Sequence, residues 1–246
     1  MQVEGKAQLI RYTSDPEQTI ALAAKLCYSG SEIDELIEKI GEKDNAKFIR
    51  ILTEMNHFSP FEHASFTFAI EGVSRALLAQ ITRHRIASFS VRSQRYVNEG
   101  DFNYIIPPKI AALGKEAKEK YEAQMAQMLT WYKEWQAQLG EGEGANEDAR
   151  FVLPNACETK MIVSMNAREL MHFFSLRCCN RAQWEIRAIA WQMLEDVLKV
   201  APSVFGRSGP GCLRGPCPEG KKCCKNSDAV REKHDALLRA CGIKIE

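Results

Sequence analysis

The clearest pattern along the chain is a short alternation of apolar and polar residues. Three aromatic or aliphatic residues are separated by small or polar ones within residues 64–71. This period of two predicts a strand with one buried face. Mixed segments at residues 2–12 and 160–165 predict two further strands.

Helical periodicity predicts most of the remaining regular structure. Residues 115–139 combine many charges with one broad apolar face, which indicates a long helix packed in the core or at a subunit interface. Asp15, Ser31, Asp44 and Asn166 stand where helix N-cap residues belong. The predicted helices cover residues 15–28, 31–40, 44–55, 74–81, 115–139, 146–154, 166–177 and a segment ending at 200.

Many helices beside few strands predict the fold class α+β. No Gly-x-Gly-x-x-Gly follows a strand, so the fold is predicted to be non-Rossmann. The length of 246 residues favours one large domain rather than two, and we assign residues 1–205 to it. A cysteine-rich extension over residues 206–246 would follow it.

Composition narrows the classes of function. Lys and Arg total 33 against 32 Asp and Glu, so no global charge draws the chain to nucleic acid or to a membrane. No apolar run approaches the roughly 18 residues of a membrane span, and no signal-peptide core is present. We therefore expect a cytoplasmic protein, in which nine cysteines indicate thiols or a metal rather than disulfides.

Two clusters raise the question of a metal. His57 and His63 have a spacing that neither a helix nor a hairpin turns inward, so we expect no metal there. Four tail cysteines could hold zinc, but they lack paired Cys-x2-Cys halves, and free thiols are the preferred interpretation. The question stays open for these four: Cys212, Cys217, Cys223 and Cys224.

Residues 83–96 carry four arginines, one histidine and three serines. No period of 2 or 3.6 sorts these charges onto one face, which predicts an irregular loop. The arginine fork matches the oxygens of phosphates and carboxylates, so the loop is a candidate anion site. A solvated basic loop and a nucleic-acid-binding module are the alternatives.

A second dense region covers residues 166–177. On a helix, Arg168 and His172 are four residues apart and share a face, and Arg177 falls near the helix end. Surface ion pairs of the two arginines with Glu169 or Glu185 explain the pattern equally well on these residues alone.

Three separated segments resemble the flavin-dependent thymidylate synthases, and together they span about residues 56–187. The central segment is Arg-His-Arg at 83–85, seven residues, then Ser93-x-Arg95. Before it comes His-x-Ser-Pro-x-Glu-His at 57–63. After it come Asn-Ala-Arg at 166–168, Arg177, and Ala-Gln-Trp-Glu-Ile at 182–186.

The resemblance implies the thymidylate synthase-complementing fold, with mixed helices packed on a small antiparallel-type sheet. It also implies FAD as cofactor and a homotetramer that shares its sites between subunits. It implies reductive methylation of dUMP to dTMP, with methylenetetrahydrofolate as carbon donor and NADPH as reductant. The residues implied for FAD are Ser59, Arg83, His84, Arg85, Asn166, Arg168 and His172. Those implied for dUMP are Gln80, Arg83, Ser93, Gln94, Arg95, Arg150 and Arg177.

The same resemblance assigns the chemistry to Arg177, which would stabilise the uracil ring as an anion, without a cysteine nucleophile. Val91 departs from the acidic residue that some members carry there. Cys178 and Cys179 adjoin Arg177, whose charge is expected to lower a thiol pKa. Another flavoprotein acting on an anionic nucleotide remains the alternative enzyme.

Overall fold

The computed structural model describes residues 1–41, 43–140 and 142–244. The described chain forms two compact units, and each strand of its sheet contributes residues to both. Unit 1 comprises residues 1–6, 70–83 and 89–162. Unit 2 comprises residues 7–69, 84–88 and those from 163 onward. No helix among the described residues has the length and apolar character needed to cross a membrane.

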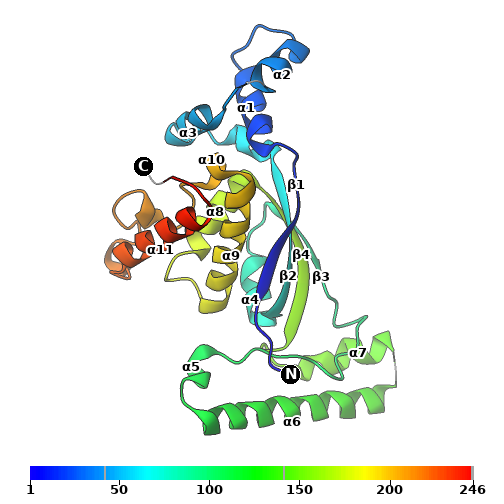
Figure 1. The fold of residues 1–246 in the computed structure, drawn as a ribbon. Coiled ribbons are helices and arrows are strands. Elements are labelled where there is room, and N and C mark those ends of the chain that lie inside the picture. The colour runs from blue at the N-terminus through cyan, green and yellow to red at the C-terminus, as the bar shows by residue number, and fades with distance from the viewer. Residues whose placement is uncertain (42, 141, 245–246) are drawn as a thin grey trace. The chain divides into compact units, whose positions relative to one another are not determined.

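A four-stranded sheet with the order β1-β2-β4-β3 runs through the described chain (Figure 1). Its pairing is antiparallel, because the start of β2 meets the end of β4: Ala167 N–H donates to the carbonyl of Ala64 at 2.8 Å. At the other side of β4, Arg92 N–H donates to Lys160 at 2.9 Å. The strands are β1 (Lys6–Tyr12), β2 (Ser65–Ser74), β3 (Ala87–Val91) and β4 (Glu158–Asn166).

The predicted strands are confirmed, and β3 corrects the prediction of an irregular loop. Residues 87–91 alternate between half-buried and exposed positions, which is a strand period confined to five residues. The charges that obscured it lie outside this short segment, at Arg83, Arg85, Arg92 and Arg95.

Unit 2 carries most of the helices. Its elements are α1 (Pro16–Leu26), α2 (Ile33–Gly41), α3 (Ala46–Glu54), the 3₁₀ helix η1 (Ser59–His63), α8 (Ala167–Arg177), α9 (Trp184–Val200), α10 (Pro202–Phe205), η3 (Gly211–Leu213), η4 (Gly220–Lys222) and α11 (Ser227–Ala240). Helix α11 was not predicted, because the density of cysteine and glycine before it suggested loops.

The core of unit 2 is built on aromatic side chains of β2, α8 and α10. Phe66, on the predicted buried face of β2, meets Phe205 edge to face at 5.2 Å between ring centroids. Phe174 of α8 meets the same ring at 6.0 Å. All three are fully buried, and each contributes about 1.5–3 kcal/mol by leaving water.

Unit 1 contains α4 (Arg75–Ile81), α5 (Pro108–Ala111), α6 (Lys115–Leu139), α7 (Glu143–Ala149) and η2 (Arg150–Val152). Helix α6 has the predicted bounds, and Met125 and Tyr132 on its apolar face are buried. Trp135, at the end of that face, remains 47% exposed. Helix α7 begins at Glu143, three residues before the predicted start at Asn146.

Two helices that directly follow a strand begin at side-chain caps, and the cap of α8 was predicted. Asn166 accepts a hydrogen bond from Glu169 N–H at 2.9 Å, which confirms its predicted role. Ser74 accepts from Leu77 N–H at 3.0 Å in the same way. Both caps fix where a strand turns into a helix, because each ends its own strand.

Of the three predicted caps of the N-terminal helices, Asp15 occupies the cap position, and Ser31 and Asp44 do not. Asp15 precedes α1 with the left-handed φ of 46°, and its side chain makes no capping hydrogen bond. Ser31 lies two residues before α2. Asp44 accepts from Ala46 N–H at 2.9 Å, although the cap position belongs to Asn45.

Gly72 in β2 occupies a position that only glycine fits. Its φ is +67°, and a Cβ there would stand 2.1 Å from the carbonyl oxygen of Glu4. The N-terminal segment therefore lies directly against the backbone of β2 within unit 1.

Candidate active site

His84 is the centre of a hydrogen-bonded chain of three side chains in unit 2. The Oε1 atom of Glu169 lies 2.8 Å from its Nδ1, and Arg177 Nε donates to its Nε2 at 3.1 Å. His84 and Glu169 are only 5% and 7% exposed. Both ring nitrogens are thus engaged, one as donor to a carboxylate and one as acceptor from a guanidinium.

Burial lowers the pKa of His84, the hydrogen bond to Glu169 opposes this, and the charge of Arg177 lowers it further. The imidazole is therefore neutral near pH 7, with its proton on Nδ1. This tautomer matches the geometry, since Nε2 needs its lone pair to accept from Arg177. A neutral histidine orients the guanidinium without cancelling its charge.

The spacing along α8 explains how this chain assembles. Glu169, Phe173 and Arg177 are four residues apart and share the helix face toward His84. The Phe173 ring meets the imidazole edge to face at 5.0 Å, and the His172 ring lies 5.8 Å away. Glu169 is a residue that sequence reasoning missed as part of the site, although this spacing could have indicated it.

Arg168 lies beside the α8 face that meets His84, but it makes a different contact. Its guanidinium pairs with Glu62 of η1 rather than with Glu169, and both side chains are about half exposed. The ion pair connects α8 to the segment that contains Ser59, which is itself exposed. Of the predicted residues, unit 2 contains Ser59, His84, Arg85, Asn166, Arg168, His172 and Arg177.

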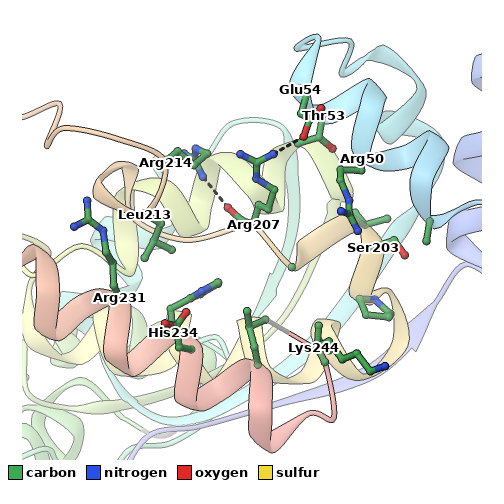
Figure 2. A pocket seen from close by; sticks show the side chains of 17 residues that line it. Arg50, Thr53, Glu54, Ser203, Arg207, Leu213, Arg214, Arg231, His234 and Lys244 are labelled. Carbon is green, nitrogen blue, oxygen red and sulfur yellow. Dashed lines mark hydrogen bonds and ion pairs between the residues drawn. The ribbon is translucent and has the colours of Figure 1, made fainter. Parts of the chain in front are cut away.

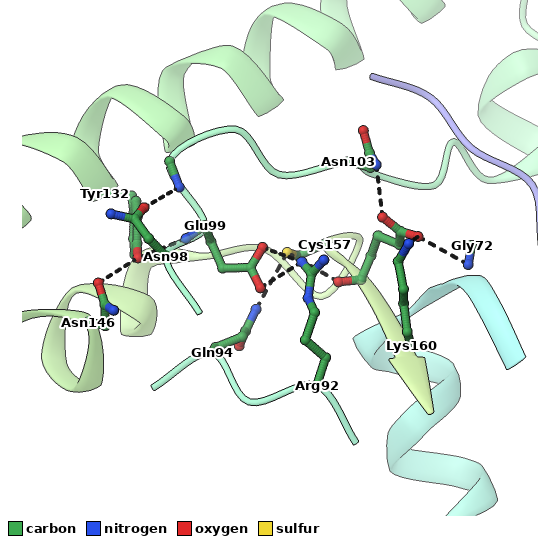
Figure 3. A network of polar contacts seen from close by, with 12 residues as sticks. Gly72, Arg92, Gln94, Asn98, Glu99, Asn103, Tyr132, Asn146, Cys157 and Lys160 are labelled. Atoms are coloured by element: carbon green, nitrogen blue, oxygen red, sulfur yellow. Dashed lines mark hydrogen bonds and ion pairs between the residues drawn. The ribbon is translucent and has the colours of Figure 1, made fainter. Parts of the chain in front are cut away.

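The end of the basic motif in unit 1 rests on a buried ion pair (Figure 3). Arg92 Nη2 contacts both oxygens of Glu99, at 2.8 and 2.6 Å. Glu99 is 2% exposed, and its burial raises the carboxyl pKa, against the lowering effect of Arg92. The motif therefore folds back on itself between residues 92 and 99.

Tyr132 of α6 fixes the same loop from the opposite side (Figure 3). Its hydroxyl accepts from Glu99 N–H at 3.1 Å and donates to Asn146 Oδ1 at 3.3 Å. Asn146 Nδ2 in turn donates to the Arg95 carbonyl at 3.1 Å. Tyr132, Asn146 and Glu99 hold the backbone around Arg95, and none of them was predicted to do so.

Arg95 and Arg150 meet at helix α7. The Arg95 guanidinium pairs with Glu143 at 2.6 Å and with Glu147 at 2.8 Å, and all three side chains are 44–45% exposed. Arg150 Nε donates to the Glu147 carbonyl at 3.1 Å. Two predicted substrate arginines thus share one short helix.

The remaining predicted residues of unit 1 occupy varied environments. Ser93 Oγ accepts from Arg95 N–H at 3.2 Å, and Gln80 Nε2 donates to the Ala76 carbonyl at 3.5 Å. Gln94 is buried, and its Nε2 donates to Cys157 Sγ at 3.4 Å. Arg83 is exposed.

The prediction that Arg177 lowers the pKa of the adjacent thiols is wrong for Cys178. This thiol is fully buried, and burial raises its pKa far above the ordinary value. The buried Cys157 has a pKa raised to about 12 for the same reason. Desolvation of the thiolate outweighs the positive charges nearby.

Cys212, Cys217, Cys223 and Cys224 form no disulfide, as expected from the sequence. Cys212 is buried, and Cys223 Sγ accepts from Lys225 N–H at 3.3 Å. Within residues 1–41, 43–140 and 142–244, no group of three or more His, Cys, Asp or Glu side chains is arranged for a metal ion.

Fold and geometry together define an α+β protein with two arginine-rich sites, one of them built around a neutral histidine. The family model of the thymidylate synthase complementing protein matches residues 8–203. The flavin-dependent thymidylate synthase of Geobacter sulfurreducens is 52% identical over 228 residues, covering 92% of this chain and 96% of that protein. The Clostridium tetani enzyme of the same name is 48% identical over 240 residues, with the same coverage.

The chain belongs to this family of flavin-dependent thymidylate synthases, which confirms the resemblance of its motifs and the predicted class of enzyme and flavin cofactor. A solved structure supports the fold. The UMP/dUMP methylase PolB from Streptomyces cacaoi, bound with 5-Br dUMP, matches with a TM-score of 0.66 at 24% identity. The match covers 82% of this chain and 93% of that one.

Proposed function

We propose that the chain converts dUMP to dTMP by reductive methylation, with FAD as cofactor, methylenetetrahydrofolate as carbon donor and NADPH as reductant. The observation that carries the proposal is the arginine at the end of α8. Arg177 is oriented by a neutral His84, which Glu169 holds in the required tautomer.

The residues of unit 2 fit the charge of a flavin dinucleotide. Its diphosphate needs cations and hydrogen-bond donors at the surface, and Arg85, Arg168, His172 and Ser59 are exposed there. The Arg168–Glu62 pair is exposed, so a diphosphate could replace the carboxylate at little cost. Asn166 would contribute through its amide, and Arg83 from the start of the motif.

A bound flavin supplies two-electron reduction, and the chain's own residues must prepare the pyrimidine. We assign the dUMP phosphate to Arg95 and Arg150, with Gln80, Arg83, Ser93 and Gln94 completing the nucleotide contacts. The exposed carboxylate partners of Arg95 contribute about 0.2–1 kcal/mol each and can yield to a phosphate dianion.

Arg177 would stabilise the negative charge that develops on the uracil ring when its imide proton leaves, which makes carbon 5 nucleophilic. His84 acts as a positioning residue for this guanidinium. No cysteine nucleophile is needed, and the raised pKa values of Cys157 and Cys178 support this. We also propose that the enzyme is a homotetramer whose subunits share the sites.

The proposal is tested on the purified protein by its visible absorption and by product analysis. We expect a flavin spectrum that changes on addition of dUMP, and dTMP formation that requires both methylenetetrahydrofolate and NADPH. NADPH oxidation without dTMP would instead indicate another flavoprotein. Sedimentation at the mass of one or two chains would contradict the tetramer.

A further inference from the structure

A cavity of about 550 Å³ lies in unit 2, lined by residues of α3, α10, α11 and the loop after α10 (Figure 2). None of the residues implied for FAD or dUMP lines it. Its cationic side chains are Arg50, Arg207, Arg214, Arg231 and Lys244. Glu54 and Asp235 are the carboxylates on the same lining, so positive charge prevails. The volume is in the range of small-molecule sites.

Arg207 and Arg214 lie close together, and a single carboxylate, Glu54, pairs with one of the two. Arg214 Nη1 donates to the carbonyl of Arg207 at 3.0 Å, and Arg207 Nη1 pairs with Glu54 at 3.0 Å. Burial lowers the pKa of Arg214, and the charge of Arg207 lowers it further. A bound anion would relieve this repulsion between like charges.

His234 of α11 supplies an independent sign of a ligand. It is 6% exposed, and its Nε2 has no hydrogen-bond partner among the described residues. Its ring bonds to the backbone of Ser208, and burial lowers its pKa, so the ring is neutral with its proton on the other nitrogen. Figure 2 shows the imidazole directed from α11 into the cavity.

A neutral, buried Nε2 is an acceptor that lacks a donor, which is costly unless something else supplies one. The cavity therefore presents cations at one place and an unsatisfied acceptor at another. Leu213, Val204 and Leu238 add apolar surface between them. A ligand that suits all three features has an anionic group, a hydroxyl group and a compact body.

We propose that this cavity binds an organic phosphate monoester with a hydroxylated body, such as a sugar phosphate or a nucleoside monophosphate. The phosphate contacts Arg207 and Arg214, and a ligand hydroxyl donates to His234 Nε2. This site is separate in its residues from those assigned to FAD and dUMP, so it does not depend on the proposed function.

Isothermal titration calorimetry of the full-length protein with ribose 5-phosphate tests the proposal, with ribose and inorganic phosphate as the two half-ligands. We expect ribose 5-phosphate to bind at least about tenfold more tightly than either half, because it makes both sets of contacts. Adenosine 5′-monophosphate distinguishes the two kinds of ligand. If it binds more tightly than ribose 5-phosphate, the ligand is a nucleoside monophosphate, and if it binds more weakly, the ligand is a sugar phosphate. Binding of ribose 5-phosphate no tighter than of inorganic phosphate overturns the proposal.

Variants locate the site. Arg214→Gln and His234→Gln should each weaken ribose 5-phosphate binding about tenfold or more. Arg239→Gln removes an exposed charge from the same helix α11 and should change it less than about twofold. Arg95→Gln tests binding at the proposed dUMP site. Loss of binding in Arg95→Gln, with Arg214→Gln unaffected, would overturn the assignment.

A measurement on the unmodified protein covers the case in which a variant fails to fold. The imidazole resonance of His234 in an NMR spectrum should shift when ribose 5-phosphate saturates the protein, because Nε2 gains a hydrogen bond. An unchanged His234 resonance at saturation would overturn the proposal.

Discussion

His84 shows how a motif residue can act through another residue. Both of its ring nitrogens are occupied by Glu169 and Arg177, so its role in the proposed reaction is to aim the guanidinium. A buried network with every member satisfied is rigid, and removal of one member leaves the others unpaired. Three predictions follow from individual side chains.

The first concerns the stability of the fold at mildly acid pH. Because the folded pKa of His84 lies below its ordinary value of 6.5, the unfolded chain binds the proton first. The free energy of unfolding should thus fall as the pH drops below 6.5 toward the folded pKa. Urea unfolding between pH 7.5 and 5.5 measures this slope.

His84→Asn removes this titrating group and should reduce the slope without abolishing it, because His234 has a lowered pKa as well. His63→Asn, at an exposed histidine, is the control. An identical slope in His84→Asn and the native chain would show that His84 is not held neutral.

The second prediction is that Arg177→Ala lowers the rate of dTMP formation by a factor of about 10²–10³ while FAD stays bound. The variant removes the positive charge that stabilises the ring anion, and loss of one such interaction costs about 2.7–4 kcal/mol, or 10²–10³ in rate. It also removes the hydrogen bond that Arg177 donates to His84. Product analysis and the flavin spectrum measure the two effects separately. Turnover at the native rate in this variant would remove Arg177 from the catalytic role.

The third prediction tests for a cysteine nucleophile. Burial disfavours the Cys178 thiolate, and Cys179 is its immediate neighbour. The double variant Cys178→Ala, Cys179→Ala should keep the rate of methylation within about tenfold, a barrier change near 1.4 kcal/mol. If the rate fell by several orders of magnitude with dUMP still bound, a thiol would have to be part of the chemistry.

At the scale of elements, helix α6 holds the loop that carries Arg95. Tyr132 bonds both to Glu99 N–H and to Asn146, which in turn holds the Arg95 carbonyl. The apolar stripe of α6 was predicted to be core or interface, and burial confirms this for Met125 and Tyr132. Within that stripe, the Tyr132 hydroxyl is the group that positions the loop carrying Arg95.

The fourth prediction follows from this connection. Tyr132→Phe leaves Glu99 N–H buried without a partner, which should cost about 1–3 kcal/mol of stability and raise KM for dUMP by loosening the loop. Tyr121→Phe on the same helix loses a bond to the Ile105 carbonyl and serves as the matched control. It should lower stability and leave KM unchanged. If both variants had the same KM for dUMP as the native enzyme, helix α6 would have no positioning role at the dUMP site.

At the scale of the whole molecule, the sequence predicts that residues 206–246 form an extension to the domain. Three buried residues of α11, Val230, His234 and Leu238, are four apart and form one face. Lys233 lies 4.4 Å from the Trp191 ring of α9. Helix α11 is therefore packed against helix α9 within unit 2.

The fifth prediction is that deletion of residues 227–246 lowers the melting temperature. The buried side chains of Val230 and Leu238 contribute about 1.5–3 kcal/mol each, so a fall on the order of 10 °C is expected. Calorimetry measures it, and the single variant Leu238→Ala should reproduce part of the effect. An unchanged melting temperature would show that α11 is a dispensable extension.

The sequence by itself determined the features that depend on neighbours along the chain. The period of β2, the full extent of α6 and the cap at Asn166 follow from local sterics and hydrogen bonding, and all are confirmed. The three motifs were likewise sufficient to identify the family, because they are runs of specific residues at fixed spacing.

Only the tertiary structure decided which groups meet across the chain. Glu169 pairs with His84, 85 positions away, and Arg168 pairs with Glu62. It also decided the pKa of Cys178, because desolvation depends on what surrounds the thiol and not on the arginine beside it in sequence. The charges and the hydrophobic period can be read directly from the sequence. Burial and long-range partners arise from packing, which no local pattern encodes.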